Sequence, residues 1–276
     1  MQTSKFFSAA VVIMIAWLIM PVSLSAQSIW LDRGESQEKS FAIEILKPNF
    51  DGEDNTTFAT SAIFLSGRIP VSDRLLLVAE LPFAHFGIEN FDESDTEFGN
   101  PYLGLEIRKP NSHLFAELGF RPPLAPENNA APLAGTAADF DRFEAFVPDI
   151  FTVTGKGNFH RKNASNLVVR LRGGPTLWID AGDALDETEF FLDYSGQVGY
   201  EGKQFSLMGG LTGRLRLWVS EADLDIGERT FHQFGAAASV ALGMVRPGIH
   251  FRIPLDDGLT DAIDFVFGLH LGVHLK

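Results

Sequence analysis

The chain has 276 residues, 22 of them basic and 36 acidic, and a formal net charge of −14. This acidic balance disfavours nucleic acid as a partner, because phosphates attract basic surfaces. The chain has no cysteine, which excludes disulfides, thiolate metal sites and lipid attachment through an N-terminal thiol. No cofactor is predicted.

The N-terminus has the pattern of a secretory signal peptide. Lys5 precedes an apolar run over residues 6–20, and small residues over 23–26 offer a cleavage site. The run is shorter than the ~20 residues that a membrane-spanning helix needs. We therefore predict a signal peptide over residues 1–26 and a polar periplasmic leader over 27–40.

Residues 41–276 alternate apolar and polar side chains with the period of two that is typical of strands. No apolar stretch after the signal reaches the ~18 residues of a membrane-spanning helix, so this part of the chain could span a bilayer only as a closed β-barrel. Alternation predicts eleven strands, at 41–47, 58–70, 75–86, 101–108, 113–121, 167–179, 189–200, 205–219, 231–244, 249–254 and 262–275.

A bacterial outer-membrane barrel needs an even number of strands, with short turns at one end and long loops at the other. Eleven strands break that rule between residues 122 and 166. Residues 148–159 are the β-prone candidate in this gap, followed by a turn over 160–166. The sequence therefore predicts an all-β fold, an antiparallel up-and-down transmembrane barrel of about twelve strands, with ten or fourteen as alternatives. The expected location is the outer membrane of a Gram-negative-type bacterium.

The two predicted ends of this barrel differ in charge. The long connections hold 23 acidic and two basic residues, at 49–57, 87–98, 122–144, 180–188, 220–230 and 255–261. The short turns hold two acidic and six basic residues, at 71–74, 109–112, 160–166, 201–204 and 245–248. Acidic loops beside anionic outer-membrane lipid would need divalent cations between them, with Asp92, Glu93, Asp95 and Glu97 as candidate ligands. The alternative is a solvated acidic loop.

The lumen is predicted to carry charge of opposite sign on opposite walls, with acidic side chains mainly from strands one to five and basic ones from strands seven to eleven. The predicted lumen-lining residues are Glu44, Arg68, Glu80, Glu106, Arg108, Glu117, Arg170, Arg172, Asp193, Arg214, Arg216, His250 and Arg252. Left unpaired, they would create a transverse field that orients small polar solutes. Paired with one another, they would instead narrow or plug the lumen.

The connection over residues 122–144 is long enough to have a function of its own. Several prolines stop a strand at its start, and Thr136 is predicted to cap a short helix that places Ala137, Phe140 and Phe143 on one face. We predict that this loop folds over or into the mouth of the barrel and gates it. A position on the outer rim is the alternative.

Residues 98–106, Phe-Gly-Asn-Pro-Tyr-Leu-Gly-Leu-Glu, are a loop ending followed at once by an alternating strand. This stretch resembles the glycine-led strand starts of the phenol-degradation, or meta-pathway, transporter-like family of bacterial outer-membrane barrels. Residues 170–175 fit a similar middle strand, and the order of signal, hairpins and terminal strand suits the whole mature chain. The resemblance implies an outer-membrane barrel that passes small, often hydrophobic or aromatic compounds, and it supplies no functional residues.

Three functions are compatible with these patterns. The first is a channel or transporter for small-molecule solutes, and the second is a structural or surface-interaction barrel with acidic outer loops and a plugged lumen. The third, a membrane-embedded hydrolase, would need a serine and a histidine within hydrogen-bond reach. No nucleophile elbow, zinc-binding helix or phosphate-binding glycine loop is present in the sequence, so no enzyme is predicted. The rival fold is a soluble periplasmic β-sandwich.

Overall fold

The structure is a computed structural model that describes residues 30, 39–51, 56–89, 94–127, 130–182, 188–217 and 229–275. Within these residues one antiparallel sheet contains thirteen strands: β1 (Lys39–Phe50), β2 (Ser61–Ser72), β3 (Leu75–Gly87), β4 (Ser94–Phe98), β5 (Tyr102–Arg108), β6 (Leu114–Arg121), β7 (Ile150–Lys162), β8 (Leu167–Asp180), β9 (Glu189–Glu201), β10 (Phe205–Arg216), β11 (Thr230–Val240), β12 (Val245–Pro254) and β13 (Ile263–Leu275). The described helical segments are α2 (Ala130–Ala138), the 3-10 turn η1 (Phe143–Ala145) and α3 (Asp257–Thr260).

The sheet closes into a barrel. Strand β1 pairs with both β2 and β13, and β2 pairs with β3, so each strand of the ring continues into the next. Strands β4 and β5 share one position, because both pair with β3, on either side of a break at residues 99–101. The barrel therefore has twelve strand positions, which confirms the predicted fold.

Strand β7 fills the gap that the parity of the barrel required. It pairs with β6 on one side and β8 on the other. Its inner side chains, among them Thr152, Lys156 and His160, are buried and polar, whereas those of Phe151 and Val153 point outward. The prediction of a strand near 148–159 is confirmed, and the strand extends three residues further.

The turn predicted at residues 245–248 is wrong. Those residues begin β12, and the turn lies at 241–244, where the Leu242 N–H donates to the carbonyl oxygen of Val245 over 2.8 Å. Gly243 has φ +69°, a left-handed conformation that favours glycine. Pro247 and Gly248 stay within the strand, paired with Leu271 and His270 of β13. A proline–glycine pair therefore did not mark the turn.

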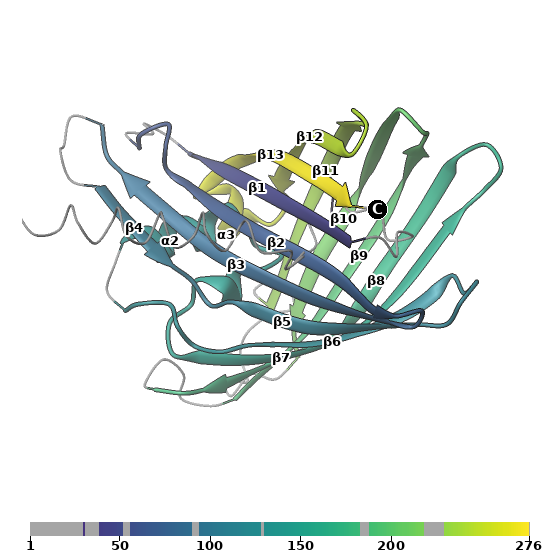
Figure 1. Ribbon diagram of the computed structural model, residues 1–276. Coiled ribbons are helices and arrows are strands. Elements are labelled where there is room, and N and C mark those ends of the chain that lie inside the picture. The colour runs from purple at the N-terminus through teal and green to yellow at the C-terminus, as the bar shows by residue number, and fades with distance from the viewer. Residues whose placement is uncertain are drawn as a thin grey trace, which may run out of the picture.

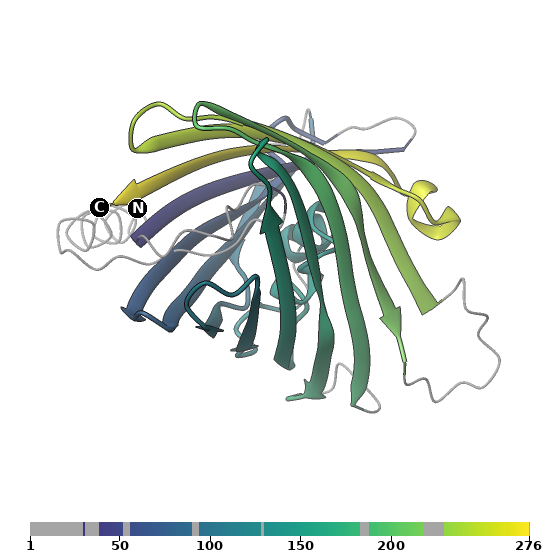
Figure 2. The same cartoon turned by 90° about the vertical axis from the view of Figure 1, so that its right-hand side faces the viewer.

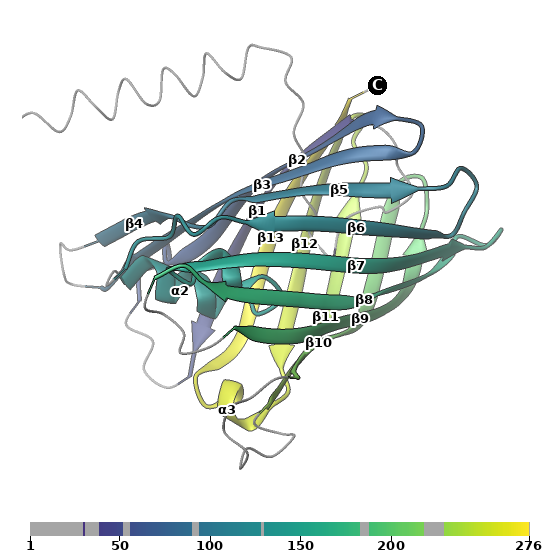
Figure 3. The ribbon, with the colours of Figure 1, turned by 90° about the horizontal axis from the view of Figure 1, so that it is seen from below.

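The two ends of the barrel differ. The short turns and the C-terminal end of β13 lie at one end, here called the turn end, and α2, α3 and β4 lie toward the other, the loop end (Figure 1, Figure 3). Helix α2 contacts β1, β2, β3 and β4 and is seen within the ring of strands in Figure 2. No described helix is both long and apolar enough to cross a membrane.

The alternation of the sequence separates an apolar outer face from a polar inner face. In β5 the side chains of Leu103, Leu105 and Ile107 are exposed on the isolated barrel, whereas Tyr102 and Glu106 are buried. A monomer that exposes so continuous an apolar surface needs hydrocarbon around it.

An apolar cluster fills the lumen at the loop end. Phe146 packs edge-to-face on Phe64 of β2, with ring centroids 5.6 Å apart. Leu46 of β1 and alanines of α2 belong to the same buried cluster. This packing holds the connection between β6 and β7 inside the barrel and so positions its charged residues.

Candidate functional site

Both ends of the connection between β6 and β7, residues 122–149, are held by one buried side chain, that of Asn100. Its amide nitrogen donates to the carbonyl oxygens of Glu144 (3.0 Å) and Val147 (2.6 Å). Its amide oxygen accepts from the N–H groups of Leu124 (2.6 Å) and Ala125 (2.7 Å). This connection, called the inner loop below, therefore starts and ends at the same point of the wall.

We expect Asn100→Ala to loosen the inner loop without opening the barrel. The change removes four hydrogen bonds, and each buried group left without a partner costs about 1–3 kcal/mol. Hydrogen exchange at the Leu124 and Ala125 amides should accelerate at least tenfold, while the strands stay protected. Asn163→Ala removes a similar pair of bonds in the exposed turn between β7 and β8 and is the control. Unchanged exchange at Leu124 and Ala125 in N100A would contradict this role.

Arg142 of the inner loop binds the acidic side of the lumen. It forms ion pairs with Glu44 of β1, with Glu80 of β3 (2.6 Å) and with Asp139 beside it (2.5 Å). Its guanidinium also lies 3.6 Å from the ring centroid of Phe64. One cation of the loop thus neutralises carboxylates from two different strands.

Acidic residues of the inner loop bind the basic side. Asp139 contacts Arg252 of β12 at 2.7 Å, and Asp141 lies 3.7 Å from the same guanidinium. Glu144 contacts Arg214 of β10 at 2.9 Å. The loop therefore presents a cation to the glutamates and carboxylates to the arginines, so its charges match those of the walls that they face.

This environment shifts the pKa values of the loop residues. Burial alone would raise the pKa of Asp139, but the guanidinium groups of Arg142 and Arg252 bring it below its ordinary value. Burial raises the pKa of Asp141, and Arg252 only partly offsets this effect. Burial would lower the pKa of Arg142, but Asp139, Glu44 and Glu80 raise it well above its usual value. Asp139 and Arg142 are therefore held in their charged forms.

The strands also pair their charges with one another. These ion pairs, several of which form small networks, are Arg68–Glu106, Arg108–Glu106, Arg121–Glu80, Lys156–Asp193, Arg170–Glu201, Arg172–Glu117, Arg214–Asp193, Arg216–Glu189 and Arg252–Glu44. His250 lies 3.0 Å from Glu44. Buried charges that are paired in this way are stabilised, whereas removing one partner leaves an uncompensated charge.

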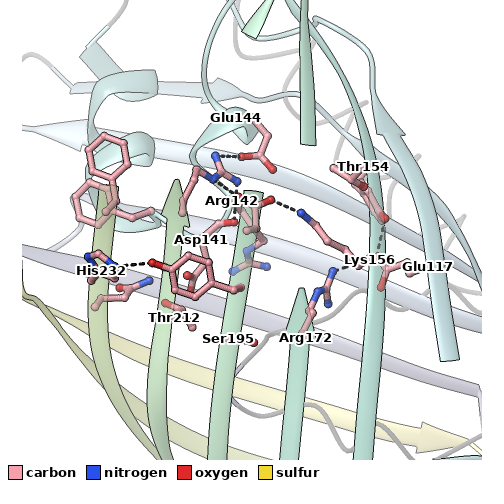
Figure 4. Close-up of a pocket in the computed structure, with 18 of the residues that line it drawn as sticks. Glu117, Asp141, Arg142, Glu144, Thr154, Lys156, Arg172, Ser195, Thr212 and His232 are labelled. Carbon is pink, nitrogen blue, oxygen red and sulfur yellow. Dashed lines mark hydrogen bonds and ion pairs between the residues drawn. The ribbon is translucent and has the colours of Figure 1, made fainter. Parts of the chain in front are cut away.

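A cavity of about 80 Å³ lies between the inner loop and the strands. Figure 4 shows Arg142 and Glu144 of the loop on one side of it and Lys156, Arg172 and Glu117 of the strands on another. Sites for organic ligands are usually several times larger. With the loop in this position, the cavity accommodates water rather than an organic solute.

All thirteen predicted lumen residues take part in these contacts. The glutamates and arginines predicted on opposite walls do not face an empty pore, because the inner loop contacts Glu44 and Glu80 as well as Arg214 and Arg252. Glu44 and Arg252 do not lie on opposite walls, because only β13 separates their strands and they contact each other at 3.6 Å. The remaining predicted residues pair with other strand residues, on the same strand, on the next one or across one intervening strand, as in Arg68–Glu106.

The predicted helix of the inner loop is placed wrongly. Helix α2 ends at Ala138, and Thr136 lies in its last turn, where its hydroxyl donates to the Pro132 carbonyl oxygen over 2.9 Å instead of capping the start. Phe140 follows the helix and Phe143 begins η1. An alanine-rich run forms the helix, and Pro132 is tolerated because the first turn needs no N–H donor there.

Trp30, in the segment predicted as a periplasmic leader, is buried inside the barrel. Its indole N–H donates to Asp141 over 3.2 Å, and its ring packs with Val168, Met208 and Ala237. Lys39 and Ser40, the last two residues of the predicted leader, belong to β1. The other residues of the predicted leader lie outside the described residues, as does the predicted signal peptide.

The predicted divalent-cation ligands are only partly described. Asp92 and Glu93 lie outside the described residues. Asp95 accepts a hydrogen bond from the Ala131 N–H at 3.2 Å, and Glu97 belongs to β4. Within the part of the chain that the structure describes, no group of histidine and acidic residues is arranged to hold a metal ion. Cation bridging at these residues stays a prediction.

Several residues of the site were missed from the sequence. Asn100 and Lys156 are not among the predicted site residues, although Lys156 alternates with outward-facing residues in β7. Tyr102 donates to Glu117 over 2.6 Å. The acidic, aromatic and basic residues over 139–144 are the sequence signal for the charged part of the inner loop, but from the sequence alone their charges are counted only as those of an outer loop.

No protein-family profile matches the chain, and no curated protein is similar to it in sequence. Solved structures are similar in fold. An outer membrane channel from Pseudomonas putida F1 is 12% identical with a TM-score of 0.57, covering 93% of this chain and 100% of that one. The NanC porin is 7% identical with a TM-score of 0.54, covering 85% and 100%. The translocator domain of the autotransporter NalP from Neisseria meningitidis is 8% identical with a TM-score of 0.55, covering 87% and 90%.

These solved structures are similar to this chain in fold. Together with the closed ring of strands and its apolar outer face, they show that the chain has the fold of an outer-membrane β-barrel.

Proposed function

We propose that this barrel is an outer-membrane channel for small molecules and that the inner loop closes it. The observation that carries the proposal is the match between the loop and the lumen walls: Arg142 faces Glu44 and Glu80, while Asp139 and Glu144 face Arg252 and Arg214. A structural barrel could fill its lumen with apolar side chains, which are often more stabilising than buried ion pairs. Charged contacts suit a loop that must leave the lumen and bind there again.

The proposal includes no enzymatic activity. His232 hydrogen-bonds to Tyr194 and Asp256, and Ser206 bonds to Ser239 and Arg246. A hydrolase of the kind considered from the sequence would pair a serine with a histidine. The solutes that we propose are small, and the resemblance of residues 98–106 to the phenol-degradation transporter-like family supports aromatic compounds among them.

Single-channel recording tests this function. The purified mature protein in planar bilayers should show discrete openings separated by long closed periods. Replacing Arg214 and Arg216 with Ala should change the conductance and lengthen the openings, because Arg214 contacts Glu144 of the loop. Liposome swelling should report solute flux in parallel. An electrically silent barrel without flux, in the wild type and in this variant, would overturn the proposal and favour a structural or surface-interaction barrel.

A further inference from the structure

The ion pairs of the lumen divide unequally between the strands and the inner loop. Among the described residues in these pairs, leaving histidines aside, the strands contribute nine basic and seven acidic side chains. The inner loop contributes three acidic side chains and one basic one. The strands therefore carry an excess of two positive charges, which the loop cancels.

The carboxylates of the loop lie against arginines from three different strands. Asp139 lies against Arg252, and Glu144 lies against Arg214 with Arg121 at 4.0 Å. These three arginines come from β12, β10 and β6, and their side chains are almost completely buried. A guanidinium in a site of low dielectric binds a carboxylate through charge-assisted hydrogen bonds.

Glu44 and Glu80, which bind Arg142, also have ion-pair partners on the strands. If Arg142 withdraws, Glu44 keeps His250 at 3.0 Å and Arg252 at 3.6 Å, and Glu80 keeps Arg121 at 2.5 Å. Arg252 loses its closest carboxylate, that of Asp139, and Arg214 loses Glu144 but keeps Asp193 at 2.5 Å. Withdrawal of the loop removes three carboxylates and one cation from these pairs, so it leaves the strands with their excess of two positive charges.

We infer that the open lumen selects anions and that Asp139 and Glu144 hold the places of a solute carboxylate, so that small organic acids are the substrates. This inference rests on the proposed channel function. In the closed state the carboxylates of the loop occupy the arginines that a solute carboxylate would bind. A solute that binds Arg252 or Arg214 therefore shifts the equilibrium toward the open state, because only that state leaves those arginines accessible.

Two measurements on the full mature protein test it. Reversal potentials in a KCl gradient should give a chloride-to-potassium permeability ratio of about 3 or more, as expected for a lumen lined by excess positive charge. Exchanging KCl for potassium acetate at equal ionic strength should raise the open probability about twofold or more, because the bound state is favoured by mass action.

Matched variants test whether Arg214 and Arg252 cause the anion selectivity and the response to acetate. R214Q/R252Q should bring the permeability ratio to about 1 or below and abolish the response to acetate. R170Q, which removes an arginine paired with Glu201 and not with the inner loop, should leave the acetate response intact. Cation selectivity, or an acetate response that survives in R214Q/R252Q, would overturn this inference and leave the channel function standing. Silence of every variant would instead reject the channel itself.

Discussion

Replacing Arg142 with methionine is expected to convert a mostly closed channel into a mostly open one. Arg142 is the cation of the inner loop that binds Glu44, Glu80 and Asp139 at once. Methionine keeps an unbranched side chain that can still pack on Phe64, but it leaves three buried carboxylates with fewer partners. Removing one member of a buried ion pair typically costs 3–5 kcal/mol, which corresponds to a shift of about 10²-fold or more in the closed-to-open ratio.

The barrel itself should survive this change, because the strands pair through their backbones and the loop is attached at Asn100. Single-channel recording would give the open probability, and the shift in gel mobility on heating would report that the barrel is folded. Arg142→Lys, which keeps the charge but not the planar fork of donors, should give an intermediate open probability. Arg161→Met, at an exposed position of β7, is the matched control. A folded R142M barrel that stays closed would show that the loop is not the gate.

The second large effect is a pH dependence in which Asp139 and Asp141 act in opposite directions. The pKa of Asp139 is lowered when the loop is inserted. Ionised Asp139 therefore stabilises the inserted loop at pH values above its usual pKa of 3.8, and this stabilisation is lost as the pH falls through the lowered pKa. The pKa of Asp141 is raised, so protonated Asp141 stabilises the inserted loop. This stabilisation is fully present below pH 3.8 and is lost as the pH rises through the raised pKa.

As the pH falls, protonation of Asp141 should therefore first lower the open probability, and protonation of Asp139 should then raise it at pH values below about 3.8. Asp141→Asn should remove the first phase, because its amide is neutral and still accepts from Trp30. Asp139→Asn should open the channel already at neutral pH and remove the second phase. The same phases in both variants would exclude these two carboxylates as the titrating groups.

The strands could be predicted almost completely from the sequence, because one face in hydrocarbon and one in a polar lumen impose a period of two on nearly every segment. Even β7, whose inner residues are polar and whose outer ones include glycines, followed from the parity of the barrel. The turn at 241–244 failed for a local reason: Gly243 alone adopts the turn conformation, whereas Pro247 and Gly248 look more like a turn but are paired in the sheet.

The inner loop could be predicted only in outline. Its length and its aromatic residues indicated a functional element, but the positions of Asp139, Arg142 and Glu144 depend on which strands lie opposite one another in the closed ring. That information is absent from local spacing. The same reason hid Asn100, whose four hydrogen bonds join segments that are far apart in the chain.

The clamp at Asn100 has a consequence for engineering. Because one amide fixes the places where the chain leaves the wall and where it returns, the distance between those places does not depend on what lies between them. Residues 126–143 can therefore be treated as an exchangeable cassette. Peptides of other lengths and charges could be grafted there to produce sensors whose pore responds to a chosen analyte.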